Sequence, residues 1–265
     1  MRAKGPSHRP DRRGVGRAPS RWAGPAIRLV TFDVDGTLTR EHGWAYLARQ
    51  LGRRSEYEAT QEAFWRGERG EDEHLLALLD LARGVPVSRL LRLLTRTPRV
   101  KGIGSTVRQL HARGQRVGLL THNPEWVSRW YSERYGFDLW SGVPQEVRSG
   151  RLEPRDHLHV DKLRALGALL RHEGLPPGAV AHVGDGPADA RVFPRVGTGV
   201  ALNARHREVW EAADLVVLTD ALPVLVPYLV RGYKVPPRWR TPPGRTGPSN
   251  DLRWSYQEPY KPRKP

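Results

Sequence analysis

The chain has 265 residues, of which 38% are hydrophobic and none is cysteine, and its formal net charge is +16. A chain of this length can bury one large or two small cores, so it does not belong to the class of disulfide scaffolds. Because it has no cysteine, thiol catalysis and cysteine-ligated zinc are also excluded. No apolar run approaches the length of about eighteen residues that spans a bilayer, and the basic N-terminus lacks the apolar region of a signal peptide, so we expect a cytoplasmic protein.

The charge is concentrated at the two ends of the chain. Residues 1–25 hold seven basic residues and one acidic residue, residues 231–265 hold nine and two, and the segment between them has a net charge of only +3. Residues 1–25 and 232–265 are also rich in glycine or proline, a composition that favours disorder. The second tail carries Trp239, Trp254, Tyr256 and Tyr260. These aromatic residues could dock on the domain, or the tails could make weak, salt-dependent, non-specific contacts with nucleic acid.

The first predicted element is a buried strand at 26–32 (AIRLVTF), which ends in the turn Asp33-Val34-Asp35-Gly36-Thr37. About eighty residues with helical spacing follow, including the leucine-rich faces at 75–81 and 90–94, which Gly84-Val85-Pro86 separates. This stretch is too long for a simple crossover connection. We therefore expect a helical cap over residues 41–99, inserted into a core made of residues 26–40 and 100–231.

The rest of the chain alternates between strand and helix patterns. A strand at 116–120 is followed by Thr121 and by a helix that starts near Pro124 and runs to about Tyr135. The further expected elements are a weak strand at 138–143, a hairpin around 149–150, a helix at 157–172, and strands at 179–183, 199–202 and 215–218. Strands that alternate with helices predict an α/β fold with a doubly wound, parallel, Rossmann-like sheet.

Polar residues cluster where three of these strands end. Asp33 and Asp35 follow the first strand, Thr121 follows the second, and Asp185 and Asp189 follow the strand at 179–183. Ligands of open α/β sheets bind at the carboxyl ends of the strands. Several carboxylates at one point repel each other unless a cation lies among them, and oxygen ligands favour Mg²⁺.

Other interpretations of these residues fit less well. A calcium loop that started at Asp33 would need a glutamate at position 44, where the chain has Trp44. The segment from Gly184 resembles a dinucleotide-binding turn, but its sixth residue is Asp189 and not glycine. The histidines show no paired zinc-binding spacing, so we expect surface or supporting roles for His42, His122, His157 and His159. Thr121 alone could cap the next helix, and a lone lysine such as Lys162 is usually a solvated helix charge.

Taken together, DVDGTLT at 33–39, Thr121, Lys162 and GDGPAD at 184–189 resemble the four motifs of the haloacid-dehalogenase-like phosphatases, and most of all the phosphoserine-phosphatase branch. The resemblance covers roughly residues 26–230, and that branch also has a helical-bundle cap after its first motif.

The resemblance implies a role for each motif residue. Asp33 is the expected nucleophile and Asp35 the general acid and base, while Thr121 and Lys162 would bind the phosphoryl oxygens. Mg²⁺ would be held by Asp33, by the backbone carbonyl of Asp35 and by Asp185. Asp189 would orient Lys162 or contact the metal through water.

The predicted substrate pocket departs from the family pattern. The acidic residue expected for a substrate ammonium is represented only by Glu41, one position early, and His42 occupies the usual place. A gap-free alignment puts Leu78 where the family has an arginine for the substrate carboxylate, and Arg66, Arg69 or Arg83 could replace that arginine. His122 follows the second motif in place of a small residue, and Ala188 replaces an asparagine in the fourth.

The sequence therefore predicts a Mg²⁺-dependent phosphomonoester hydrolase for a small phosphorylated metabolite. Phosphoserine is the best single substrate, and a sugar or nucleotide phosphate is the alternative. Glu41 and His122 are candidate substrate contacts. Nothing in the pattern predicts an oligomeric state.

Overall fold

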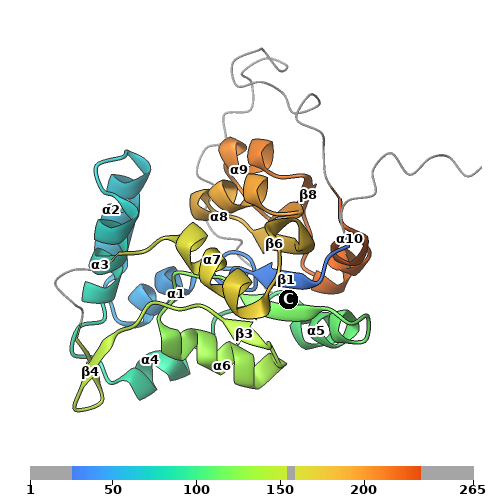
Figure 1. Cartoon of the computed structure of the whole chain (residues 1–265). Helices are drawn as coiled ribbons and strands as arrows, with labels where there is room; N and C mark the ends of the chain where they lie inside the picture. The colour runs from blue at the N-terminus through green and yellow to red at the C-terminus, as the bar shows by residue number, and fades with distance from the viewer. Residues whose placement is uncertain (1–25, 154–158, 234–265) are drawn as a thin grey trace, which may run out of the picture. The chain divides into compact units, whose positions relative to one another are not determined.

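Six parallel strands form the central sheet, in the order β3-β2-β1-β6-β7-β8 (Figure 1). The computed structural model describes residues 26–153 and 159–233, and all structural statements concern these residues. The topology confirms the predicted doubly wound parallel fold. The strands are β1 (Leu29–Phe32), β2 (Arg116–Leu119), β3 (Leu139–Trp140), β6 (Val180–Gly184), β7 (Thr198–Leu202) and β8 (Leu215–Val217).

Helices cover both faces of the sheet because successive strand residues point to opposite sides. Val30 and Phe32 belong to a buried cluster with residues of α5 (Ile103–His111), α6 (Glu125–Tyr135) and α10 (Val226–Arg231). Leu29, which precedes Val30 and points to the opposite face, packs in a second cluster with residues of α7 (Lys162–Glu173) and α8 (Pro187–Val192). α9 (Arg207–Ala212) packs near α8 (Figure 1). Short 3₁₀ turns lie at Pro177–Ala179, Phe193–Arg195 and Leu222–Leu225.

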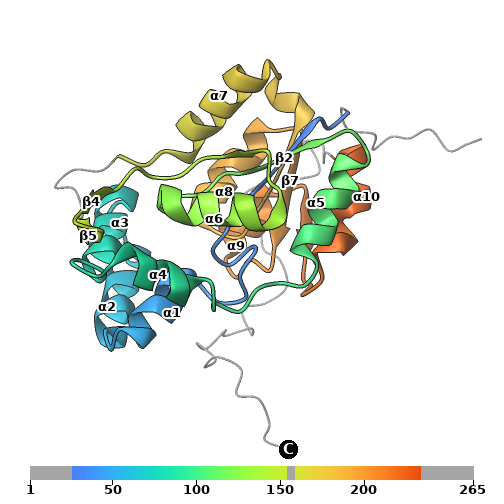
Figure 2. The same ribbon diagram turned by 90° about the horizontal axis from the view of Figure 1, so that it is seen from below.

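Four helices lie between β1 and α5 and form a group beside the sheet (Figures 1 and 2). They are α1 (Gly43–Gln50), α2 (Arg54–Trp65), α3 (Glu71–Asp80) and α4 (Val87–Leu94). The leucine spacing predicts the last two of them, and the first two lie in the stretch for which the sequence indicates only helical spacing. We call this group the helical insertion. Asp72 of α3 ties it to the segment before α7, since its carboxylate accepts a hydrogen bond from the Val160 backbone N–H at 2.7 Å and lies 3.0 Å from Nδ1 of His159.

The predicted hairpin is present as β4 (Glu146–Arg148) and β5 (Arg151–Glu153). Its turn residues Ser149 and Gly150 both have positive φ, as a two-residue hairpin turn requires. The hairpin packs on the connection between α3 and α4, where the Gly84 N–H donates to the Leu152 carbonyl at 2.9 Å. This part of the predicted core segment therefore contacts the helical insertion.

Three predicted elements are markedly shorter in the structure, and local hydrogen bonding explains one of the differences. The first strand, expected at 26–32, begins at Leu29. The helix expected at 157–172 begins at Lys162, because the Asp161 side chain caps it by accepting from the backbone N–H groups of Leu163 and Arg164. The strand expected at 138–143 is only two residues long. Apart from Gly232 and Tyr233, the predicted tails lie outside the described residues, as does His157. Within the described ranges, no helix combines the length and apolarity needed to cross a bilayer.

Candidate active site

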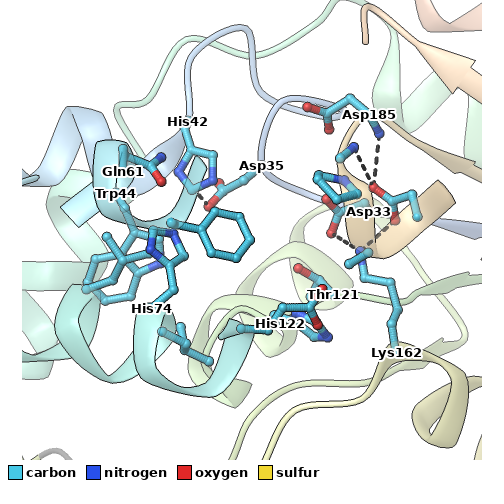
Figure 3. Close-up of a pocket in the computed structure, with 18 of the residues that line it drawn as sticks. Asp33, Asp35, His42, Trp44, Gln61, His74, Thr121, His122, Lys162 and Asp185 are labelled. Carbon is cyan, nitrogen blue, oxygen red and sulfur yellow. Dashed lines mark hydrogen bonds and ion pairs between the residues drawn. The ribbon is translucent and has the colours of Figure 1, made fainter. Parts of the chain in front are cut away.

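The candidate site lies where β2, β1 and β6 end side by side. These three strands are neighbours in the sheet, so their parallel alignment brings Thr121, Asp33 and Asp185 to the same edge. All three line one pocket, together with Asp35, Lys162 and His122 (Figure 3). Asp189 lines the same pocket. The structure thus brings together every predicted site residue except Glu41.

Lys162 connects the first and fourth motifs. Its Nζ lies 3.2 Å from Oδ1 of Asp33 and 2.6 Å from Oδ1 of Asp189, and its side chain is only 3% exposed. As the first residue of α7 it lies at the positive end of the helix dipole, which disfavours a cation. Burial also lowers the pKa of Lys162, but the two carboxylates outweigh this effect and the net pKa is raised. The ammonium is therefore charged and held against Asp33.

Asp189 uses both carboxylate oxygens in hydrogen bonds. Oδ2 accepts from the backbone N–H groups of Asp185 and Gly186, each at 3.0 Å, while Oδ1 faces Lys162 and, at 2.8 Å, Nε2 of His182. Burial would raise the pKa of Asp189, but Lys162 and His182 lower it, and the net shift is downward. Of the two roles open to Asp189 in the sequence analysis, these contacts support the orientation of Lys162.

The donor set at this edge fits a divalent cation. One oxygen from each of Asp33, Asp185 and Asp189 can be chosen so that the three lie within 4.8 Å of one another. Burial raises the pKa of Asp33, although the charge of Lys162 opposes this shift. Burial and the charge of Asp33 together raise the pKa of Asp185 well above its usual range. A cation between Asp33 and Asp185 would offset the cost of two neighbouring anions, one buried and one half-buried, and their oxygen ligands suit Mg²⁺.

Gly36 allows the first motif to approach Asp185 closely. Its φ is +80°, and a Cβ atom at this position would lie 2.0 Å from Oδ2 of Asp185. The Thr37 hydroxyl donates to Oδ1 of the same carboxylate at 2.7 Å. The turn after β1 therefore fixes the orientation of Asp185 through a residue that the sequence analysis did not single out.

The Asp35 side chain points away from the other carboxylates and toward the helical insertion (Figure 3). The Gly43 N–H, in the first turn of α1, donates to its Oδ1 at 3.0 Å, and Nδ1 of His42 lies 3.6 Å from its Oδ2. Asp35 thus lies between the strand-end edge that holds Asp33, Thr121 and Asp185 and the helical wall of the pocket. That position suits proton exchange with a leaving group.

Thr121 has its hydroxyl oxygen fixed by Asn123, which the sequence analysis missed. Oγ1 accepts from the backbone N–H of Asn123 at 3.2 Å and from its side-chain amide at 3.1 Å. These contacts leave the hydroxyl hydrogen available to donate to an oxygen in the pocket. Thr121 is not the cap of the next helix, because α6 begins at Glu125 with Pro124 before it.

The wall of the pocket that faces Asp35 is largely aromatic and apolar. It includes Leu78, at the position aligned with the family arginine, and further residues of the helical insertion: Trp44, Gln61, Phe64, Trp65, His74 and Leu75. Phe64 stacks on His74, and Trp65 stacks on His206, which precedes α9, with ring centroids 3.8 Å apart in the latter pair.

Few charged groups other than those at the strand-end edge reach this wall. Among the described lining residues these are Arg205 and Glu71, and Glu71 pairs with Arg191. Glu41 is not among them and pairs with Arg49, and none of Arg66, Arg69 and Arg83 lines the pocket. His122 does line it, and burial with the nearby charge of Lys162 lowers the pKa of His122 to about 3, so the ring is neutral.

Comparisons with known proteins agree with this geometry. The family model of haloacid dehalogenase-like hydrolases matches residues 30–193. The phosphoserine phosphatase of Archaeoglobus fulgidus is 32% identical over 183 residues, which cover 68% of this chain and 53% of the relative. That of Streptomyces coelicolor is 29% identical, covering 72% and 48%. The chain therefore spans about half the length of these curated relatives.

A solved structure also has the same fold. It is described as a phospho-aspartyl intermediate analogue of phosphoserine phosphatase, and it superposes with a TM-score of 0.68 at 22% identity, covering 77% of this chain and 99% of its own.

Proposed function

Since the chain belongs to the haloacid dehalogenase-like hydrolases, we propose that it is a Mg²⁺-dependent phosphomonoester hydrolase that works through an aspartyl-phosphate. The observation that carries this proposal is the position of Asp33, whose carboxylate lies 3.2 Å from the buried ammonium of Lys162 at the edge that also holds Thr121 and Asp185. A nucleophile, a fixed cation and a hydroxyl donor thus surround one space large enough for a phosphoryl group.

In the first step, a carboxylate oxygen of Asp33 attacks phosphorus and the bond from phosphorus to the ester oxygen breaks. Asp35 protonates the departing ester oxygen, so the products are an aspartyl-phosphate and a neutral alcohol. Lys162 and the Thr121 hydroxyl bind the phosphoryl oxygens and stabilise their charge in the transition state. Mg²⁺, held by Asp33, the Asp35 carbonyl and Asp185, would supply further charge neutralisation.

In the second step, Asp35 is a carboxylate and takes a proton from water. The water oxygen attacks phosphorus, the bond to Asp33 breaks, and inorganic phosphate leaves. We propose that residues 41–99 form the cap of the site and limit the access of water while the intermediate forms. The hydrogen bond from Gly43 of α1 to Asp35 supports this assignment, because it makes the acid–base group depend on the insertion.

Phosphoserine is the first candidate substrate, and the names of the curated relatives support it. The pocket itself favours a second candidate, a sugar or nucleotide phosphate whose leaving group is uncharged near the scissile bond and carries a ring. Phe64 of the aromatic wall is partly exposed and can pack on a ring, while Leu78 offers no charge to a carboxylate.

The experiment is a phosphomonoester panel with Mg²⁺ that includes p-nitrophenyl phosphate, phosphoserine, sugar phosphates and nucleoside monophosphates. We expect hydrolysis that EDTA abolishes and that is lost in Asp33→Asn, but kept in the surface control Asp220→Asn. Full activity in Asp33→Asn would contradict the nucleophile assignment. The ratio of kcat/KM for phosphoserine to that for the best ring-bearing ester decides between the two candidates.

A further inference from the structure

We propose that His182 is a positioning residue, which holds Asp189 in the orientation that keeps Lys162 against Asp33. This inference rests on the proposed function, in whose steps His182 takes no direct part. His182 lies in β6 with no exposed surface, and its neighbours Ala181 and Val183 are apolar. A polar ring in the middle of a buried strand is costly unless both its nitrogens have partners.

Both ring nitrogens do have partners. Nε2 lies 2.8 Å from Oδ1 of Asp189, and Nδ1 lies 2.9 Å from the hydroxyl oxygen of Thr31. Thr31 is the residue opposite His182 in the register between β1 and β6, and it is also fully buried. The two side chains thus form a connection inside the sheet, which leads from β1 to the fourth motif.

The direction of the first hydrogen bond follows from its acceptor. Both oxygens of Asp189 receive other N–H donors, Oδ2 from two backbone groups and Oδ1 from the Lys162 ammonium, so the carboxyl group has no proton to donate and the proton lies on Nε2 of His182. With a neutral ring, the Thr31 hydroxyl donates to Nδ1. With a charged ring, the same hydroxyl accepts from Nδ1 and turns toward the Ala181 carbonyl, 3.4 Å away. The bond to Asp189 is the same in both cases.

This bond matters because Oδ1 of Asp189 is shared. It accepts from the Nε2–H of His182 in the sheet and from the ammonium of Lys162 in the pocket. Oδ2 accepts from two backbone N–H groups. Without His182, the buried Oδ1 has one donor left and the carboxylate is free to tilt toward it. Lys162 would shift with it, and a displacement of about 1 Å in such a group costs on the order of 10²-fold in rate.

The ring could instead be needed only to fill space, since it packs at 5.8 Å on the ring of Phe193. The two roles predict opposite rankings of substitutions. If His182 only fills space, the apolar His182→Leu is tolerated better than His182→Gln. If His182 positions Asp189, glutamine keeps an N–H donor near Nε2 and restores activity that leucine loses.

The test is to measure kcat and KM for p-nitrophenyl phosphate with Mg²⁺ in both variants, alongside their thermal midpoints. We expect kcat to fall at least about 10-fold in His182→Leu and to recover in His182→Gln. Thr31→Val and Thr31→Ser test the contact of the Thr31 hydroxyl with His182 in the same way. We expect a higher kcat in the serine variant, which keeps the hydroxyl. Equal kcat in leucine and glutamine variants, or leucine the better of the two, would overturn the inference. An inactive wild type would count against the proposed function instead.

An NMR measurement tests the same connection without catalysis. In protein labelled with ¹⁵N-histidine, the Nε2 proton of His182 should give a slowly exchanging signal that is absent from His182→Gln. In Lys162→Met this signal should shift, because both donors share Oδ1 of Asp189. A signal that exchanges freely, or does not move in Lys162→Met, would refute the positioning role.

Discussion

The ammonium of Lys162 lies 2.6 Å from Oδ1 of Asp189, and both side chains are at most 3% exposed. Lys162 is the first residue of α7, so its charge opposes the helix dipole. The attraction of the Asp33 and Asp189 carboxylates keeps the charged ammonium in this position. The contacts of Lys162 therefore affect both the stability of the fold and the chemistry of the site.

Lys162→Met should therefore impair both properties. Removing one partner of a buried ion pair typically costs about 3–5 kcal/mol, because the other charge stays buried without compensation. We expect the free energy of unfolding, measured in urea, to fall by about 3 kcal/mol, and phosphatase activity to be lost. Lys101→Met is the matched control, since the Lys101 side chain is 73% exposed, and its unfolding free energy should stay within about 0.5 kcal/mol of the wild type. Equal stability of the two variants would contradict the conclusion that Lys162 and Asp189 form a buried ion pair.

The effect of Asp185→Asn on thermal stability should depend on whether Mg²⁺ is present. In EDTA, Asp185→Asn should raise the thermal midpoint, because it removes a half-buried anion whose pKa is raised by loss of solvation and by the charge of Asp33. In the wild type, Mg²⁺ at a hundred times its Kd should add about 2.7 kcal/mol of stability. Asp185→Asn should lose this gain and the exposed control Asp220→Asn should keep it. A full Mg²⁺ response in Asp185→Asn would exclude Asp185 as a ligand.

Asp35→Asn should separate the two chemical steps. With p-nitrophenyl phosphate the leaving group needs no proton, so a rapid burst of p-nitrophenol close to one equivalent per chain should precede slow turnover. With an alkyl phosphate both steps need Asp35, and the rate should fall by about 10²–10⁴-fold. The measurement is stopped-flow absorbance for the burst and phosphate release for the turnover.

Glu41→Gln is the control for Asp35→Asn. Glu41 lies outside the pocket and pairs with Arg49, so this variant should keep nearly all of the activity. Undiminished steady-state turnover in Asp35→Asn, or a large loss in Glu41→Gln, would count against these roles.

The neutral His122 should make stability depend on pH. Its pKa is about 3 in the folded protein and 6.5 when solvated, so the unfolded chain binds more protons between these values. The contribution of the neutral His122 ring to the free energy of unfolding is complete above pH 6.5 and is lost as the pH falls toward 3. Between pH 8 and pH 5, the wild type should therefore lose about 2 kcal/mol more than His122→Asn.

Urea unfolding at both pH values in EDTA checks this, with the exposed His172→Asn as the control. Parallel pH profiles for the wild type and His122→Asn would show that His122 is protonated freely.

The site edge could be predicted from the sequence because it depends on local patterns. Buried parallel strands appear as apolar runs, and whatever follows such runs meets at one edge of the sheet. Asp33, Thr121 and Asp185 each follow such a run directly, so their meeting requires only the strand order. The start of α7 was placed too early, since its boundary depends on the cap that Asp161 provides.

Other features depend on which side chains meet in space. The sequence contains a polar residue inside each of two apolar strands, Thr31 in LVTF and His182 in VAHVG, and only the register of β1 with β6 makes them a connected pair. Glu41 is close to the first motif in sequence yet turns to Arg49 instead of the pocket.

The sequence by itself therefore determined the fold class, the alternation of strands and helices in the core, and the strand-end residues Asp33, Thr121 and Asp185, because period and strand-end position are local properties. The phosphoryl-transfer roles and the choice of Lys162 came from the family resemblance. Tertiary structure alone decided that Lys162 is buried between two carboxylates, that Asp35 faces the helical insertion, and that the opposite wall is aromatic. Those features depend on contacts between segments far apart in the chain, whose burial sets both the charge of each group and the direction in which it points.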